Sequence, residues 1–132
     1  GPAGDTFPWG RDPAIESCSS VIYGRNDGLP CASEERLPQP VKSASQDVTS
    51  FGVHDLAGNV SEWVVDAFKD GYDPECSKDC AYTAPVNSDV QRVARGGYLE
   101  GWSESLRAAG RSRFDHEAVF ANLGFRCAKD GE

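Results

Sequence analysis

Segment 55–63 carries the residues whose chemistry is easiest to interpret in this chain of 132 residues. It reads Asp-Leu-Ala-Gly-Asn-Val-Ser-Glu-Trp and combines two carboxylates, a glycine-centred turn and an aromatic anchor. Hard cations such as calcium are bound by carboxylate and carbonyl oxygens that converge on one point. A tight turn at residues 57–59 can aim nearby oxygens inward, which predicts a cation site. The alternative is an Asx turn at Asp55 with Glu62 on a solvated strand face.

Other polar residues give weaker signals. His116 could act as a general base, but a single histidine in a loop is usually a solvated surface residue. Arg107 and Arg111 are expected to be structural partners of nearby carboxylates. No Ser/His/Asp arrangement is evident, and Gly96-Gly97 is far from a nucleotide-binding fingerprint.

The five cysteines indicate disulfide bonds. A zinc site is the alternative, but Cys76 and Cys80 supply only half of one, and neither histidine has a matching spacing. The expected pairs are Cys18–Cys31 and Cys76–Cys80, with Cys127 left over. Disulfides form in oxidising compartments, so an extracytoplasmic or secreted location is expected.

Composition narrows the classes of function. The net charge is −8, with 13 basic residues scattered among 21 acidic ones. Nucleic-acid binding is therefore not expected, because it depends on neutralising phosphate. No apolar run has membrane-spanning length, so membrane insertion is not expected either. A hydrophobic content of 39% indicates one folded domain.

The elements that must position these residues are short. Fourteen glycines and eight prolines imply many turns. Residues 1–50 are expected to be irregular apart from a short strand at 20–23, and residues 67–90 to form a long loop. Strands are predicted at 60–66, from Arg92 to a break at Gly96-Gly97, and at 122–128, while 106–114 is a strand or a short helix. The pattern favours an α+β or mostly irregular fold.

Four segments, in this order, resemble the formylglycine-generating enzyme (sulfatase-modifying factor) superfamily. They are Phe-Pro-Trp-Gly at 7–10, Gly-Val-His-Asp-Leu-Ala-Gly-Asn-Val-Ser-Glu-Trp at 52–63, Arg-Val-Ala-Arg-Gly-Gly at 92–97 with Leu-Arg-Ala-Ala at 106–109, and Asn-Leu-Gly-Phe-Arg at 122–126. The resemblance implies a C-type-lectin-like fold in which residues 1–132 are the C-terminal part of one domain. An N-terminal fragment or another chain would then complete the core, because large exposed apolar patches are rare in monomers. A cysteine in that missing part is the family's partner for the position of Cys127.

The resemblance also implies a calcium site. Asp55 and Glu62 would supply side-chain oxygens, and Gly58 and Val60 would supply backbone carbonyl oxygens. A second calcium site of the family corresponds to residues 18–30, where the ligands do not match.

Catalytic residues of the family are missing. The enzymes bind copper through two cysteines that follow the Arg-Gly-Gly segment, and Cu(I) requires such soft ligands. Gly101 and Leu106 stand at those positions, so no copper and no formylglycine-generating activity are expected.

Residues close to these positions could form a ligand-binding cleft, because aromatic rings supply contact area and acids supply orientation. The candidates are Tyr98, Glu100, Trp102, Ser103 and Glu104; alternatively, Trp102 packs in the core and the glutamates face solvent. The main hypothesis is a calcium-stabilised, non-catalytic module that binds an unknown small molecule or protein. The alternative is an oxidoreductase of the superfamily with altered, iron-based or other, chemistry.

Overall fold

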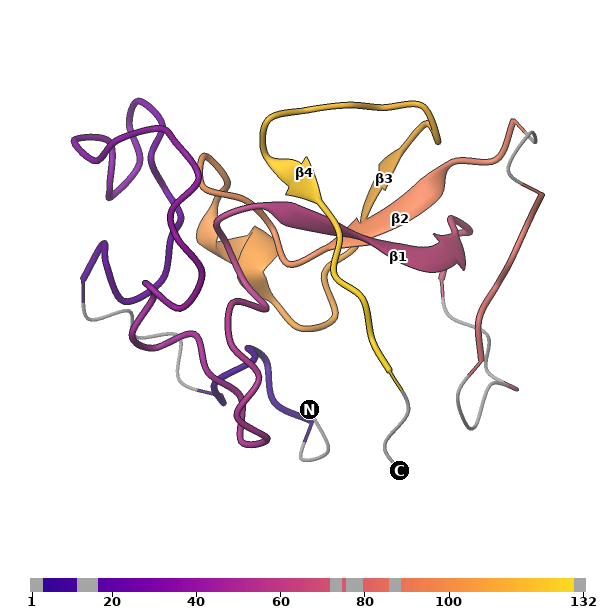
Figure 1. Ribbon diagram of the computed structural model, residues 1–132, viewed down its shortest axis with the longest axis horizontal. Helices are drawn as coiled ribbons and strands as arrows, with labels where there is room; N and C mark the ends of the chain where they lie inside the picture. The colour runs from indigo at the N-terminus through magenta and orange to yellow at the C-terminus, as the bar shows by residue number, and fades with distance from the viewer. Residues whose placement is uncertain (1–3, 12–16, 72–74, 76–79, 86–88, 130–132) are drawn as a thin grey trace.

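The fold is a small, four-stranded sheet flanked by long irregular segments. A computed structural model describes residues 4–11, 17–71, 75, 80–85 and 89–129. The strands are β1 (Ser61–Ala67), β2 (Arg92–Arg95), β3 (Ser112–Phe114) and β4 (Leu123–Gly124), in the order β3-β2-β1-β4. The β1–β4 pair is parallel and the others are antiparallel. Figure 1 shows the irregular N-terminal part lying to one side of this sheet.

The two central strands follow the sequence pattern. β1 pairs with β2 through Trp63 opposite Ala94, and its register shifts before Ala67. β2 ends at Arg95, where the double glycine begins with φ values of +92° and +70°. A Cβ atom at Gly96 would lie 2.9 Å from the carbonyl oxygen of Leu56. The predicted strand at 60–66 and the break at the double glycine are therefore confirmed.

Three local predictions need correction. Residues 20–23 form no strand; Ser20 lies in a turn and Val21 in a bend, and the segment accepts single hydrogen bonds, such as that from Asn59 N to Ile22 O at 2.7 Å. In 106–114 only the last three residues form a strand, after the 3-10 turn η1 (Ser103–Leu106). The final strand is two residues long because its pairing with β1 ends at Gly124. In each case tertiary contacts outweigh local apolar pattern.

The core lies between the irregular N-terminal part and the segment around η1. One cluster of buried side chains joins distant parts of the sequence: Phe7, Val21, Tyr23, Cys31, Ala57 and Leu106. A second cluster contains Ile22, Ala44 and Leu99. Several described residues of the N-terminal part are thus packed in the core without forming a strand or helix.

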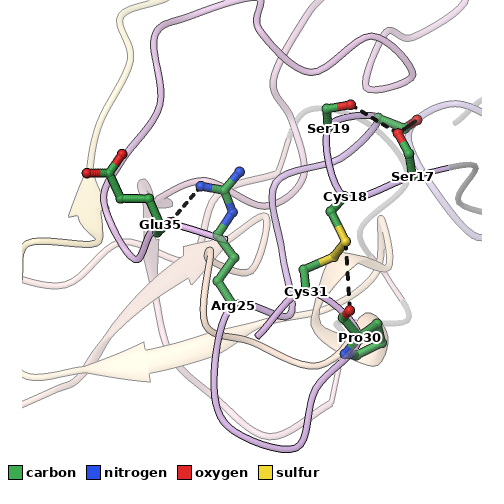
Figure 2. The surroundings of a disulfide bond; sticks show 8 residues. Ser17, Cys18, Ser19, Arg25, Pro30, Cys31 and Glu35 are labelled. Carbon is green, nitrogen blue, oxygen red and sulfur yellow. Dashed lines mark hydrogen bonds between the residues drawn. A yellow bond between two sulfur atoms is a disulfide. The ribbon is translucent and has the colours of Figure 1, made fainter. Parts of the chain in front are cut away.

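A disulfide bond crosslinks the N-terminal part. Cys18 and Cys31 are bonded at an S–S distance of 2.07 Å, which confirms that predicted pair (Figure 2). Figure 2 also shows Arg25, a buried residue that donates a hydrogen bond to the carbonyl oxygen of Glu35 at 2.7 Å. Cys80 is disulfide-bonded as well, but Cys76 lies outside the described residues. Cys127 is free and exposed.

The prediction of short strands with much irregular structure is confirmed. In the described ranges the helical component of the expected α+β class is limited to η1. No helix in that part of the chain is long and apolar enough to cross a membrane.

Candidate cation site

The loop that precedes β1 has a tightly determined backbone. Asp55, Gly58 and Asn59 all adopt left-handed conformations, with φ between 57° and 74°. Gly58 N donates to Gly96 O at 2.6 Å, and Leu99 N donates to Asn59 O at 3.0 Å. A Cβ atom at Gly58 would lie 2.3 Å from Ile22 O, so only glycine fits between the loop and the N-terminal part. The neighbouring segments therefore fix the turn that the sequence predicts.

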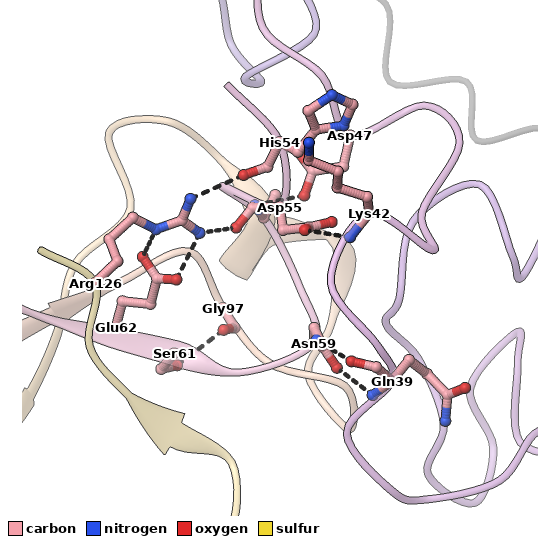
Figure 3. A network of polar contacts seen from close by, with 11 residues as sticks. Gln39, Lys42, Asp47, His54, Asp55, Asn59, Ser61, Glu62, Gly97 and Arg126 are labelled. Carbon is pink, nitrogen blue, oxygen red and sulfur yellow. Dashed lines mark hydrogen bonds and ion pairs between the residues drawn. The ribbon is translucent and has the colours of Figure 1, made fainter. Parts of the chain in front are cut away.

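The Asn59 side chain is used inside the fold. Its Nδ2 donates to Gln39 O at 3.0 Å, and its Oδ1 accepts from Gln39 N at 2.8 Å (Figure 3). These two bonds imitate a backbone pair between strands and hold the 37–42 segment against the loop. Asn59 is thus a structural residue, because both polar atoms of its side chain are hydrogen-bonded to Gln39.

Asp47 anchors the loop before β1 through hydrogen bonds. This residue was not identified from the sequence. It is completely buried. Its carbonyl oxygen accepts from Asp55 N at 3.0 Å, and its Oδ2 accepts from Ala57 N at 2.7 Å. Burial raises the pKa of Asp47 to about 6 against the opposing effect of the Ala57 hydrogen bond, and the Asp55 carboxylate adds to the rise. No local motif marks this aspartate, because its role depends on a contact ten residues away.

The four residues predicted to bind calcium line one pocket of about 440 Å³. They are Asp55, Gly58, Val60 and Glu62. Among the described residues, none donates a hydrogen bond to the carbonyl oxygens of Gly58 and Val60. Asp55 Oδ2 accepts from Lys42 N at 2.7 Å. The residues that carry the two predicted carboxylates and the two predicted carbonyl groups therefore line the same pocket.

Arg126 enters the same pocket from the segment after β4. Its Nε donates to Glu62 Oε2 at 2.6 Å and its Nη2 to Glu62 Oε1 at 2.5 Å. Nη1 donates to His54 O at 2.8 Å, and Nη2 also donates to Asp55 O. Figure 3 shows the guanidinium between the Glu62 carboxylate and these two carbonyl groups. The hydrogen bonds to Glu62 raise the pKa of Arg126 further above its usual range, so the group is permanently charged.

The donor set fits a calcium ion chemically. Calcium takes six to eight oxygen ligands, including backbone carbonyls and water. No cluster of three His, Cys, Asp or Glu side chains occurs in the part of the chain that the structure describes, so an ion here would depend on carbonyl oxygens. An ionised carboxylate has about four lone-pair sites, and Arg126 uses two of those on Glu62. The oxygen atoms are of the kind that calcium binds, but the Glu62 carboxylate is also hydrogen-bonded to Arg126.

The five predicted cleft residues lie elsewhere. Trp102 is 67% exposed and does not pack in the core. Ser103 and Glu104 are in η1, where Ser103 Oγ donates to Glu104 Oε2 at 3.3 Å. Tyr98 and Glu100 are half-buried. None of the five lines the cation pocket or a second pocket of about 290 Å³ beside Asp66, Lys69 and Arg111.

Gly101 and Leu106, which the resemblance aligns with the copper-binding cysteines, offer no side-chain ligand for a metal. A Cβ atom at Gly101 would lie 2.8 Å from Ser105 Oγ and 3.1 Å from Tyr98 O. Leu106 is 1% exposed and belongs to the core cluster. A side chain at the first position would thus be tightly packed, and the second position is filled by an apolar side chain.

Comparisons with known proteins agree with the sequence motifs. A family model described as "Sulfatase-modifying factor enzyme 1-like domain" matches residues 1–131. A formylglycine-generating enzyme from Streptomyces coelicolor is 33% identical over 138 residues, which cover 100% of this chain and 43% of that enzyme. Serine/threonine-protein kinase pkn1 from Chlamydia caviae is 34% identical over 135 residues, which cover 96% of this chain and 21% of the kinase.

Solved structures share the fold. PvdO from Pseudomonas aeruginosa superimposes with a TM-score of 0.65 at 25% identity, covering 91% of this chain and 42% of PvdO. Treponema denticola variable protein 1 gives a TM-score of 0.60 at 26% identity, covering 84% of this chain and 37% of that protein. The chain thus spans less than half the length of each relative.

Proposed function

The chain belongs to the sulfatase-modifying factor enzyme 1-like domain family, and on that basis we propose that it is a calcium-stabilised, non-catalytic module that binds a ligand or a protein. The observation that carries the proposal is the convergence of Asp55, Gly58, Val60 and Glu62 on one pocket. Asp55 and Glu62 would bind the ion through side-chain oxygens, and Gly58 and Val60 through carbonyl oxygens. Calcium there would crosslink the loop to the start of β1.

The non-catalytic part of the proposal is supported by the residues at positions 101 and 106. Thiolates are the ligands that suit Cu(I), and Gly101 and Leu106 offer none. Gly101 is closely surrounded by Ser105 and Tyr98, and Leu106 is buried in the core.

The binding part of the proposal concerns a partner. Residues 1–132 would be the C-terminal part of a C-type-lectin-like domain that an N-terminal fragment or another chain completes. Two facts support this: the chain covers 43% of a formylglycine-generating enzyme, and several large apolar side chains are exposed. These are Leu37, Val41, Phe51, Val53, Val65, Tyr82, Trp102, Val119, Phe120 and Phe125. Tyr98, Glu100, Trp102, Ser103 and Glu104 are the candidates for contact with a further small-molecule or protein ligand. The Cys18–Cys31 disulfide supports an extracytoplasmic location.

Calcium-dependent stability tests the proposed function. The melting temperature of the protein should rise when calcium is added and fall again with chelator, since an ion that binds only the folded state adds about 2.7 kcal/mol at a concentration of 100 Kd. Glu62→Ala should abolish this rise, whereas Glu34→Ala, at an exposed position outside the pocket, should keep it. A wild-type melting temperature that does not respond to calcium would refute calcium stabilisation of the wild-type protein.

Metal analysis of the purified protein separates the two functional hypotheses. The proposed module should contain calcium alone. Iron or copper at one equivalent per chain would instead support an oxidoreductase with altered chemistry.

A further inference from the structure

Arg126 binds the carboxylate of Glu62, one of the four proposed calcium ligands, and two carbonyl oxygens beside the pocket. All three nitrogens of its guanidinium donate hydrogen bonds in this pocket, two of them to the Glu62 carboxylate and two to the carbonyl groups of His54 and Asp55. The pocket lining includes Arg126 together with the four proposed calcium ligands. A positively charged group of the protein therefore already occupies part of the cation's coordination space.

The contact with Glu62 has the strongest geometry available to such a pair. Two parallel N–H···O bonds of 2.6 and 2.5 Å form a fork between guanidinium and carboxylate. The pair is only partly exposed, with side-chain accessibilities of 39% for Arg126 and 20% for Glu62. Both oxygens of Glu62 are engaged by arginine, so a calcium ion that chelates Glu62 with both oxygens must displace these bonds.

The positive charge of Arg126 also opposes calcium binding. The pocket offers two carboxylates, Asp55 and Glu62, and Arg126 neutralises one of them. A divalent cation near a fixed guanidinium is repelled by it, and the repulsion is stronger at a partly buried site than in water. Arg126 also crosslinks the chain as a bound cation would, because its hydrogen bonds connect residues 54–55 and β1 to the segment after β4.

We propose that Arg126 is an internal counter-cation that competes with calcium for Glu62. Without calcium, the guanidinium holds the site together; with calcium, Glu62 turns from arginine to the metal. This inference rests on the proposed calcium site and adds a control on its affinity. Arg126 thus lowers the affinity for calcium while it stabilises the calcium-free protein.

The variant Arg126→Gln tests the competition. It removes the charge and the fork while it keeps a polar chain of similar reach. Calorimetric titration with calcium chloride should give a Kd at least tenfold lower than that of the wild type, and the melting temperature of the chelator-treated protein should fall. Arg126→Lys keeps the charge without the fork and should give an intermediate Kd. Arg36→Gln, which breaks the exposed pair with Asp27 outside the pocket, is the matched control and should leave the Kd unchanged.

Two further measurements identify the mechanism. The NMR signal of the Arg126 Nε–H should shift when calcium is added to the wild type, as its bond to Glu62 is lost. Measured against Glu62→Gln alone, the double variant Arg126→Gln/Glu62→Gln should show a smaller gain in affinity than Arg126→Gln shows over the wild type, because only the direct charge repulsion is then relieved.

The outcomes separate this inference from the proposed function. If the wild type binds calcium and Arg126→Gln binds it equally or more weakly, competition is wrong and Arg126 positions Glu62 for the ion. If Arg126→Gln binds calcium and the wild type does not, competition is supported and calcium stabilisation of the wild type is refuted. If neither protein binds calcium, both proposals are overturned.

Discussion

At the scale of single residues, the candidate site is governed by two ionisable groups with opposite environments. Arg126 is partly exposed and has hydrogen-bond partners at every guanidinium nitrogen. Asp47 is completely buried, and its carboxylate accepts a hydrogen bond from Ala57 N. Burial of a carboxylate disfavours its charged form. Asp47 therefore holds the loop at an electrostatic cost that depends on pH.

The stability of the calcium-free protein should decrease as the pH rises through the pKa of Asp47. Burial raises this pKa from 3.8 to about 6, so the folded protein binds the proton more tightly than the unfolded chain does. The resulting contribution, on the order of 3 kcal/mol for two pKa units, is fully present below about pH 4 and is lost as the pH passes about 6.

Urea unfolding of wild type and Asp47→Asn between pH 4 and 7.5, with EDTA present, measures this contribution. The variant should show a flatter dependence of the unfolding free energy on pH. Asp27→Asn, at a side chain that is 90% exposed, should keep the wild-type slope. Parallel curves for wild type and Asp47→Asn would contradict the prediction.

At the scale of elements, the loop before β1 connects the sheet to the N-terminal part of the chain. It contacts the double glycine after β2 through Gly58 N and the N-terminal part through Asn59 N. Strands as short as β3 and β4 contribute little pairing of their own. The site thus depends on loops fixed by packing, and glycine is required where backbones approach closely.

Gly58→Ala should destabilise the fold much more than Gly28→Ala. Both glycines have left-handed backbones, with φ of +74° and +78°, so the conformational cost of about 1–2 kcal/mol applies to each. Only at Gly58 would the new Cβ atom meet backbone, at 2.3 Å from Ile22 O, whereas nothing lies within 4 Å at Gly28. We expect Gly58→Ala to lose roughly 2 kcal/mol more than Gly28→Ala in urea unfolding. Equal losses would show that the loop can move away from Ile22.

At the scale of the whole molecule, the surface combines a net charge of −8 with exposed apolar side chains. Val41 and Phe125, which are 82% and 76% exposed, lie at the cation pocket. Scattered apolar residues are normal on a protein surface, but larger groups of them mark interaction sites. This distribution agrees with the proposal that another fragment covers part of the surface.

The chain on its own should therefore bind the dye ANS and self-associate in light scattering at low calcium. Both signals should fall when the chain is produced together with an N-terminal fragment of the domain, because the fragment would cover the apolar side chains. Gel mobility with and without reductant would show whether Cys127 bonds to that fragment. A compact 14.2 kDa monomer that binds no ANS would refute the two-fragment proposal.

The features that could be predicted from sequence are those that local chemistry determines. The turn at 57–59, the strand that became β1 and the break at Gly96-Gly97 depend on residue types close together in the chain. The same holds for the Cys18–Cys31 pair, whose thirteen-residue separation made it the nearest partner. The missing copper ligands at Gly101 and Leu106 are also a local fact, since a side chain that is absent cannot bind a metal.

The tertiary structure alone decided how the candidate site is controlled. Arg126 reaches Glu62 across 64 residues, and Asp47 reaches Ala57 from a segment without a motif. It also decided that residues 20–23 form no strand and that Trp102 points to solvent. Such contacts depend on which segments pack together, and packing combines many small long-range terms that no local pattern contains. The sequence therefore determined which oxygen atoms could bind a cation, and the fold decided that an arginine binds the Glu62 carboxylate among them.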